Sequence, residues 1–167
     1  MPTNAFPSTV TQVDTAARFP LGYLVTVPAK GAGTDADRGE QVWVYVAAEA
    51  ALATGDIVVR DPSALTNDMY GVTPSAGGAL VAMSVVGVAQ HTIGSGSFGF
   101  VQAKGQCLVK NGTADITADT GITSGGSRNG AAIDIAAGAE HCVFGFSLEA
   151  EATDNTTFDA YINCFGA

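Results

Sequence analysis

Basic residues are scarce in this chain: 7 Lys and Arg stand against 16 Asp and Glu, which gives a formal net charge of −9. Nucleic-acid phosphates and anionic membrane surfaces both need a concentrated basic face on their partner. The seven cations are scattered, and no two lie closer than six positions. We therefore expect no nucleic acid and no membrane among the direct partners, whereas the charge favours a basic protein surface.

Cysteines and long apolar runs are also few. The chain has three cysteines, Cys107, Cys142 and Cys164, which are widely spaced. An odd number at such spacings argues against a disulfide framework. We therefore predict that the three thiols are reduced and buried. The longest apolar stretch, Ala79 to Ala89, is too short to span a bilayer. The first residues have neither a basic region nor an apolar one, so we expect no secretory signal peptide.

The chain contains only 7 Leu, against 28 Ala, 21 Gly, 17 Val and 17 Thr. Val and Thr favour strands, and Gly favours tight connections. Strand-like runs occur at Val42 to Val46, Ile57 to Arg60 and Phe98 to Val109. We predict a mainly β fold: a small barrel or sandwich of about seven or eight short antiparallel strands with an extended N-terminal arm.

The last two predicted strands alternate most clearly. One places Cys142, Phe144, Phe146 and Leu148 on one face, opposite Val143, Gly145 and Ser147. The other places Phe158, Ala160, Ile162 and Cys164 on one face, opposite Asp159, Tyr161 and Asn163. A period of two is typical of a strand with one covered face.

Residues 1–20 differ from the rest of the chain because they hold three of its six prolines. Proline removes amide donors and favours extended backbone. We therefore divide the chain into an arm, 1–20, and a single β domain, 21–167. The arm carries four apolar residues that we predict to bind a partner: Phe6, Val10, Val13 and Phe19.

The sequence carries no enzyme signature, and we predict no catalytic residues, no cofactor and no metal. Gly94 to Gly99 matches G-x-G-x-x-G, but a strand-like run follows where a dinucleotide site needs a helix, so we interpret it as a turn. Asp35 and Asp37 have the spacing of the first two ligands of a cation-binding loop, but the residues that follow depart from the EF-hand pattern. The sequence leaves open whether a surface cation binds there. Nothing in the spacing of His91, His141 and the cysteines supports a metal site or a Cys-His pair.

The segment from Val85 to Gly105, VVGVAQHTIGSGSFGFVQAKG, resembles a signature of the small capsid decoration (cement) proteins of tailed bacteriophages. The matching positions of the turn and strand include Gly87, Gly96, Gly99, Phe100, Gln102 and Gly105. Ala51 to Val58 resembles an Ala-rich turn and Gly-Asp strand entry in that family, and Phe144 to Ile162 resembles its closing hairpin. Together these segments cover about two thirds of the chain.

This resemblance implies a structural virion protein on the outer capsid surface, made in the host cytoplasm. Such proteins act as homotrimers that clamp neighbouring subunits of the major capsid protein. The alternative is a fibre-like or carbohydrate-binding β module. Its sugar-stacking aromatics would come from Tyr23, Trp43, Tyr45 and Tyr70.

Overall fold

The computed structural model describes residues 9–28, 39–61, 69–77, 85–112, 115–125, 129–135 and 143–164. Across these ranges all regular structure is β, and none of it is helical. Within the same ranges there is accordingly no helix long and apolar enough to cross a membrane. The mainly β prediction is confirmed for this part of the chain.

The strands are more numerous than the seven or eight predicted. They are β1 (Val13–Asp14), β2 (Leu24–Val27), β3 (Gln41–Ala48), β4 (Ile57–Arg60), β5 (Gly71–Pro74), β6 (Val85–Val88), β7 (Phe98–Lys110), β8 (Gly121–Ser124), β9 (Ala132–Asp134), β10 (Gly145–Ser147) and β11 (Thr157–Asn163). Strands β1, β5, β8 and β9 were not predicted. Strands β5 and β8 lie in stretches rich in Gly, Thr and Ser, which carry no clear hydrophobic period, and β1 and β9 have only two and three residues.

Five strands close into a barrel. Strand β3 pairs with β5, β5 with β4, β4 with β6, β6 with β7, and β7 returns to β3. The closing β3–β5 pair is parallel, which corrects the all-antiparallel prediction. Closure removes most free edges, so the barrel alternative holds and the sandwich does not.

The barrel interior is filled by small and branched apolar side chains. Alternate residues of β3 and β7 point inward, and the cluster comprises Val44, Val46, Ala48, Leu52, Val58, Val72, Ala89, Ile93, Val101 and Ala103. The Val and Ala enrichment of the sequence thus has a structural cause, because five strands leave little room inside for larger side chains.

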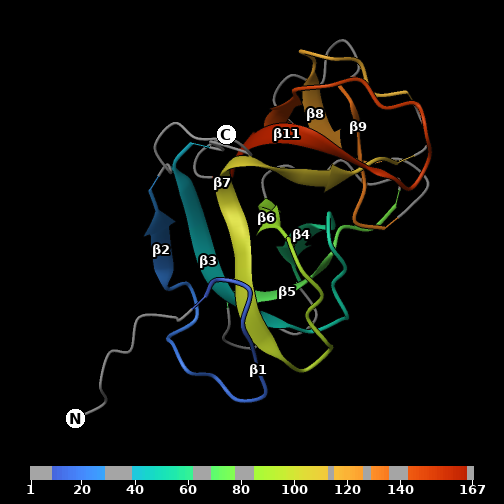
Figure 1. Cartoon of the computed structure of the whole chain (residues 1–167). Coiled ribbons are helices and arrows are strands. Elements are labelled where there is room, and N and C mark those ends of the chain that lie inside the picture. The colour runs from blue at the N-terminus through green and yellow to red at the C-terminus, as the bar shows by residue number, and fades with distance from the viewer. Residues whose placement is uncertain are drawn as a thin grey trace.

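The described strands form one continuous sheet, and its longest strand, β7, joins the barrel to a second part of that sheet (Figure 1). Its first half pairs with β3 in the barrel, and its second half, Lys104 to Lys110, pairs with β11. Beyond β11 follow β10, β8 and β9 in that order. A second core lies between this second part of the sheet and the barrel, and it includes Ile57, Val88, Cys107, Phe144, Phe158 and Ile162.

A third core covers the outer side of β3 and β7. The side chains of Trp43, Tyr45 and Phe100 point away from the barrel interior. On this outer side, Val25 of β2 and other side chains from residues 10–27 pack over them. Aromatic residues fit here because this layer lies outside the narrow barrel. The N-terminal segment therefore forms part of the hydrophobic core.

The face predicted for Cys142 to Leu148 is wrong for part of the strand. Phe144 is buried as predicted, but Phe146 and Leu148 are exposed, at 43% and 39%. The inward positions belong to Gly145 and Ser147. Regular pairing begins only at Gly145, so Phe144 reaches the core from the connection before the strand and does not share the face of Phe146.

Candidate functional site

The glycines of the decoration-protein signature set the path of β7. Gly96 has φ +75° in the turn that precedes β7, where Ser97 N–H donates to Gly94 O over 3.0 Å. A Cβ at Gly99 would lie 2.8 Å from Ile93 Cδ1. The Gly94–Ser97 segment is therefore a turn that leads into a strand, as the sequence predicted.

Three further signature residues meet where β7 passes from its pairing with β3 to its pairing with β11. Gly105 has φ +105°, and a Cβ there would lie 2.7 Å from Glu40 O. Buried Gln102 donates through Nε2 to Lys104 O (3.1 Å) and Gln106 O (3.0 Å), which fixes the backbone on both sides of Gly105. A Cβ at Gly87 would lie 2.5 Å from Gln102 O. With Phe100 in the third core, these residues act in the architecture of the domain.

The described residues of the predicted arm contact the domain itself. Val13 pairs with Gly99 through β1, and Val10 and Phe19 pack against the third core. Phe6, with residues 1–8, lies outside the described residues. Two of the four predicted partner-binding residues thus pack within the chain's own core, and Val13 is 41% exposed beside them.

Phe19 is the main anchor of this segment. Its ring stacks on Tyr23 with centroids 5.4 Å apart, meets Tyr45 edge-on at 5.2 Å, and lies 5.6 Å from Phe100. Aromatic pairs at such distances add to the free energy gained by burying apolar area. The segment is therefore held on β3 and β7.

The four aromatic residues proposed for sugar stacking do not form an exposed platform. Trp43 and Tyr45 are 4% and 0% exposed. Tyr23 packs against the third core, and Tyr70 packs against the barrel core. Side chains from residues 10–27, including Val25 of β2, pack over Trp43 and Tyr45.

Only some of the residues that were considered for a metal or thiol site lie within the described residues. Asp35, Asp37, His141 and Cys142 lie outside the described residues. Among the residues that the structure describes, no group of three or more His, Cys, Asp or Glu could hold a metal ion. Cys107 and Cys164 are reduced; Cys107 is buried, and burial raises the pKa of the Cys164 thiol to about 12.

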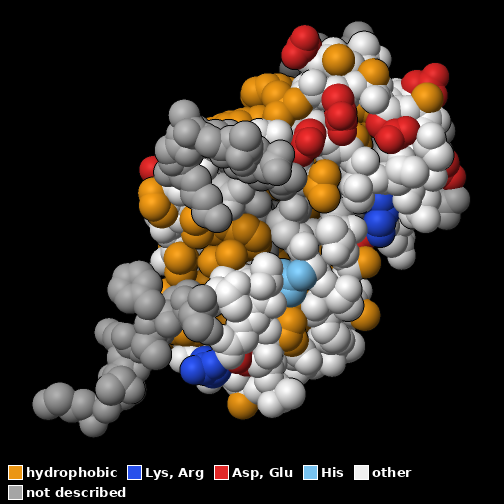
Figure 2. Space-filling view, viewed as in Figure 1, with side chains coloured by type: hydrophobic (Ala, Val, Ile, Leu, Met, Phe, Trp, Pro, Cys, Tyr) orange, Lys and Arg blue, Asp and Glu red, His pale blue; other side chains and the backbone are white. Residues whose placement is uncertain are grey.

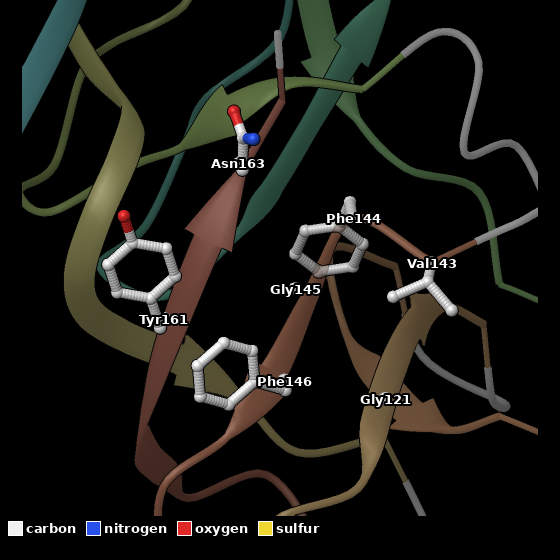
Figure 3. Close-up of a pocket in the computed structure, with 7 residues that line it drawn as sticks. All are labelled: Gly121, Val143, Phe144, Gly145, Phe146, Tyr161 and Asn163. Atoms are coloured by element: carbon white, nitrogen blue, oxygen red, sulfur yellow. The ribbon is translucent and has the colours of Figure 1, made fainter. Parts of the chain in front are cut away.

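A groove that sequence reasoning missed lies on the outer face of the second part of the sheet, over β8, β10 and β11 (Figure 3). Its volume is about 360 Å³, and its walls are mainly apolar. Phe146 of β10 and Tyr161 of β11 are paired across the strands, with their rings stacked 5.4 Å apart. The lining residues are Gly121, Val143, Phe144, Gly145, Phe146, Tyr161 and Asn163. Gly121 and Gly145 contribute backbone to this lining.

Carboxylates lie beside Phe146 and Leu148, next to this groove but outside its lining. Asp159 lies two positions before Tyr161, on the same face of β11. Its backbone N–H donates to Glu149 Oε1 over 2.7 Å. Asp119 N–H donates to Ser147 O, next to Phe146. Figure 2 shows acidic side chains gathered over the lobe that contains β8, β9 and β11, beside a patch of hydrophobic ones.

Comparisons with known proteins show a likeness in structure alone. No family model and no curated protein matches the sequence. A solved structure that matches is the N base of the head fiber gp8.5 in bacteriophage phi29, with a TM-score of 0.53 and 16% identity. The match covers 76% of this chain and 98% of that one. At this identity the likeness shows that the two chains share a fold.

Proposed function

We propose that this chain is a structural protein of a phage virion, which decorates the outer capsid surface and is made in the host cytoplasm. The observation that carries the proposal is the fold shared with the phi29 head fiber base over nearly the whole of that chain. The decoration-protein resemblance of Val85 to Gly105 agrees with the proposal, and the glycines of that segment occupy positions that the fold requires.

In this proposal the protein acts as a homotrimer that clamps neighbouring subunits of the major capsid protein, and it performs no catalysis. Three weak contacts joined in one trimer bind far more tightly than one, because the second and third contacts form at a high effective concentration. Residues 1–8, including Phe6, would provide the contacting arm, since Val10 and Phe19 are engaged in the domain.

A fibre-like role is the second candidate, and the same neighbour favours it because that protein is the base of a head fiber. In this case the domain would anchor a projecting fibre at one point on the shell. The two roles differ in geometry: a clamp contacts several capsid subunits, whereas a fibre base needs only one attachment position.

Binding to undecorated capsids of the phage that encodes the protein tests both candidates. We expect light scattering to give a particle of about three times the 16.8 kDa chain mass, and sedimentation with capsids to saturate. Electron cryo-microscopy then separates a clamp, with density across several capsid subunits, from a fibre base. A monomer at high concentration contradicts the trimer, and no co-sedimentation at saturating protein contradicts both virion roles.

A further inference from the structure

The groove between Phe146 and Val143 is a feature that the proposed arm contact does not use. Phe146 is among the few large apolar side chains of the described residues that are well exposed, as is Leu148 two positions later. Tyr161 and the two bare glycines extend this apolar surface across three strands. An exposed apolar patch that is hollowed and rimmed by polar groups is typical of a binding surface.

The charges beside the groove indicate the chemistry of its partner. Asp119, Glu149 and Asp159 lie near the part of β10 that carries Phe146 and near Leu148, outside the groove lining itself. The two lysines of β7 are engaged with other carboxylates: Lys110 pairs with Asp56, and Lys104 lies 3.8 Å from Glu40. A partner that brings positive charge would therefore meet a complementary potential.

We propose that this face binds a protein segment with an apolar side chain flanked by Lys or Arg. The apolar side chain enters the groove beside Phe146 and Tyr161, and the flanking cations lie over Asp119, Glu149 and Asp159. This surface is separate from the N-terminal segment, so it gives a capsid-bound molecule a second contact. Its test uses the isolated protein, and its failure is therefore distinct from a failure to bind capsids.

Two other occupants fit the observations less well. A second copy packed on the same face around a two-fold axis would oppose the carboxylates beside the groove of both chains, which repel. A sugar needs several hydrogen-bonding groups for its hydroxyls, whereas the groove walls are mainly apolar, with polar side-chain atoms supplied by Tyr161 and Asn163.

The direct experiment titrates the ¹⁵N-labelled protein with the hexapeptide Lys-Arg-Leu-Phe-Arg-Lys and follows amide resonances. We expect shifts around Phe146 and Tyr161, and none for a peptide with Glu in place of the four cations. Phe146→Ala should weaken binding at least about fivefold, as expected for truncation of an aromatic contact residue. Leu24→Ala is the matched control, because Leu24 is 50% exposed on β2 and far from the groove in the strand order.

The charge contribution has its own variants. The double variant Asp119→Asn, Asp159→Asn should bind the basic peptide more weakly. Its affinity should also depend less on salt, because it lacks two of the charges that salt screens in the wild type. Asn tolerates the φ of +58° at Asp119. Glu49→Gln, which removes an exposed charge after β3, should change neither the affinity nor its salt dependence.

Several results would overturn the proposal. They are no shifts with the basic peptide, an affinity unchanged by Phe146→Ala, or equal binding of the Glu-substituted peptide. Shifts around Phe146 that appear on concentrating the protein alone would assign the groove to a second copy. Shifts there with maltotriose or an N-acetylglucosamine oligomer, and none with the peptide, would assign it to a sugar.

Discussion

The phenol of Tyr45 donates a hydrogen bond of 2.8 Å to Asp14 Oδ2, which joins the N-terminal segment to the barrel wall. Asp14 is 7% exposed and also accepts from Gln12 Nε2 over 2.9 Å, with Arg18 3.6 Å away. A buried carboxylate needs such partners, because an unpaired one costs several kcal/mol or is protonated. The bond thus ties together two regions that the sequence predicted to be separate.

Replacing Tyr45 by Phe should lower the free energy of unfolding by about 1–3 kcal/mol, because Asp14 stays buried and loses a donor. Urea denaturation followed by fluorescence of Trp43 measures this. Tyr23→Phe removes a hydroxyl in the same aromatic cluster and should change stability by less than about 0.5 kcal/mol. If the two variants lose equal free energy of unfolding, the hydrogen bond to Asp14 contributes no more to stability than the Tyr23 hydroxyl does.

The same pair predicts a dependence on alkaline pH. Burial, opposed in part by the Arg18 backbone and reinforced by Asp14, raises the pKa of Tyr45 from 10.0 to about 12. A raised pKa means that the neutral phenol stabilises the fold fully below pH 10, and that this contribution is lost as the pH rises from 10 to about 12. The stability difference between wild type and Tyr45→Phe should therefore narrow over this range. A difference that stays constant from pH 8 to pH 12 would contradict it.

Gly105 and Gly96 allow two costs of replacing a glycine to be compared: the cost of a left-handed backbone and the cost of a steric clash. Both have positive φ, but a Cβ at Gly105 would meet Glu40 O, whereas nothing lies within 4 Å of one at Gly96. Gly96→Ala should cost about 1–2 kcal/mol for the left-handed conformation alone. Gly105→Ala should cost more, because β7 must also move away from Glu40. Thermal unfolding of both variants tests the order, and the reverse order would refute this account of the junction.

The two described thiols should react slowly in the native protein. Cys107 is 0% exposed, and a pKa of about 12 leaves little thiolate at Cys164 near neutral pH. In a Cys142→Ser variant, we expect a disulfide reagent at pH 8 to label both thiols quickly in denaturant and slowly without it. Rapid native labelling of Cys164 is the result that would exclude this.

Two N-terminal deletions distinguish the arm from the core. Removing residues 1–20 deletes β1 and Phe19, uncovers Tyr45 and Phe100, and should destabilise the fold by about 3 kcal/mol or more, as for loss of a core Phe. Removing residues 1–8 keeps every described contact of the segment and should leave a folded protein that binds capsids more weakly. If the shorter deletion binds as well as the full chain, the arm has no role in attachment.

Much of the candidate site lay beyond the reach of sequence reasoning. The alternation around Phe146 was visible, but alternation reports which residues share a face and never which face another layer covers. Phe146 and Phe144 therefore looked equivalent, although one is exposed and the other is 2% exposed. One feature of the sequence could have indicated that Phe146 is exposed: it lies opposite a polar face of the next strand, which carries Asp159 and Asn163.

The sequence by itself determined the β class, the strand Ile57–Arg60, the turn at Gly94–Ser97 and the buried face of β11, because local propensity and a period of two are properties of neighbouring residues. Only the tertiary structure decided the barrel closure through β3 and β5, the return of residues 9–20 onto Tyr45, and the open groove at Phe146. Each of these joins segments far apart in the chain. Their free energy comes from burying one segment against another, and no local pattern records that partner.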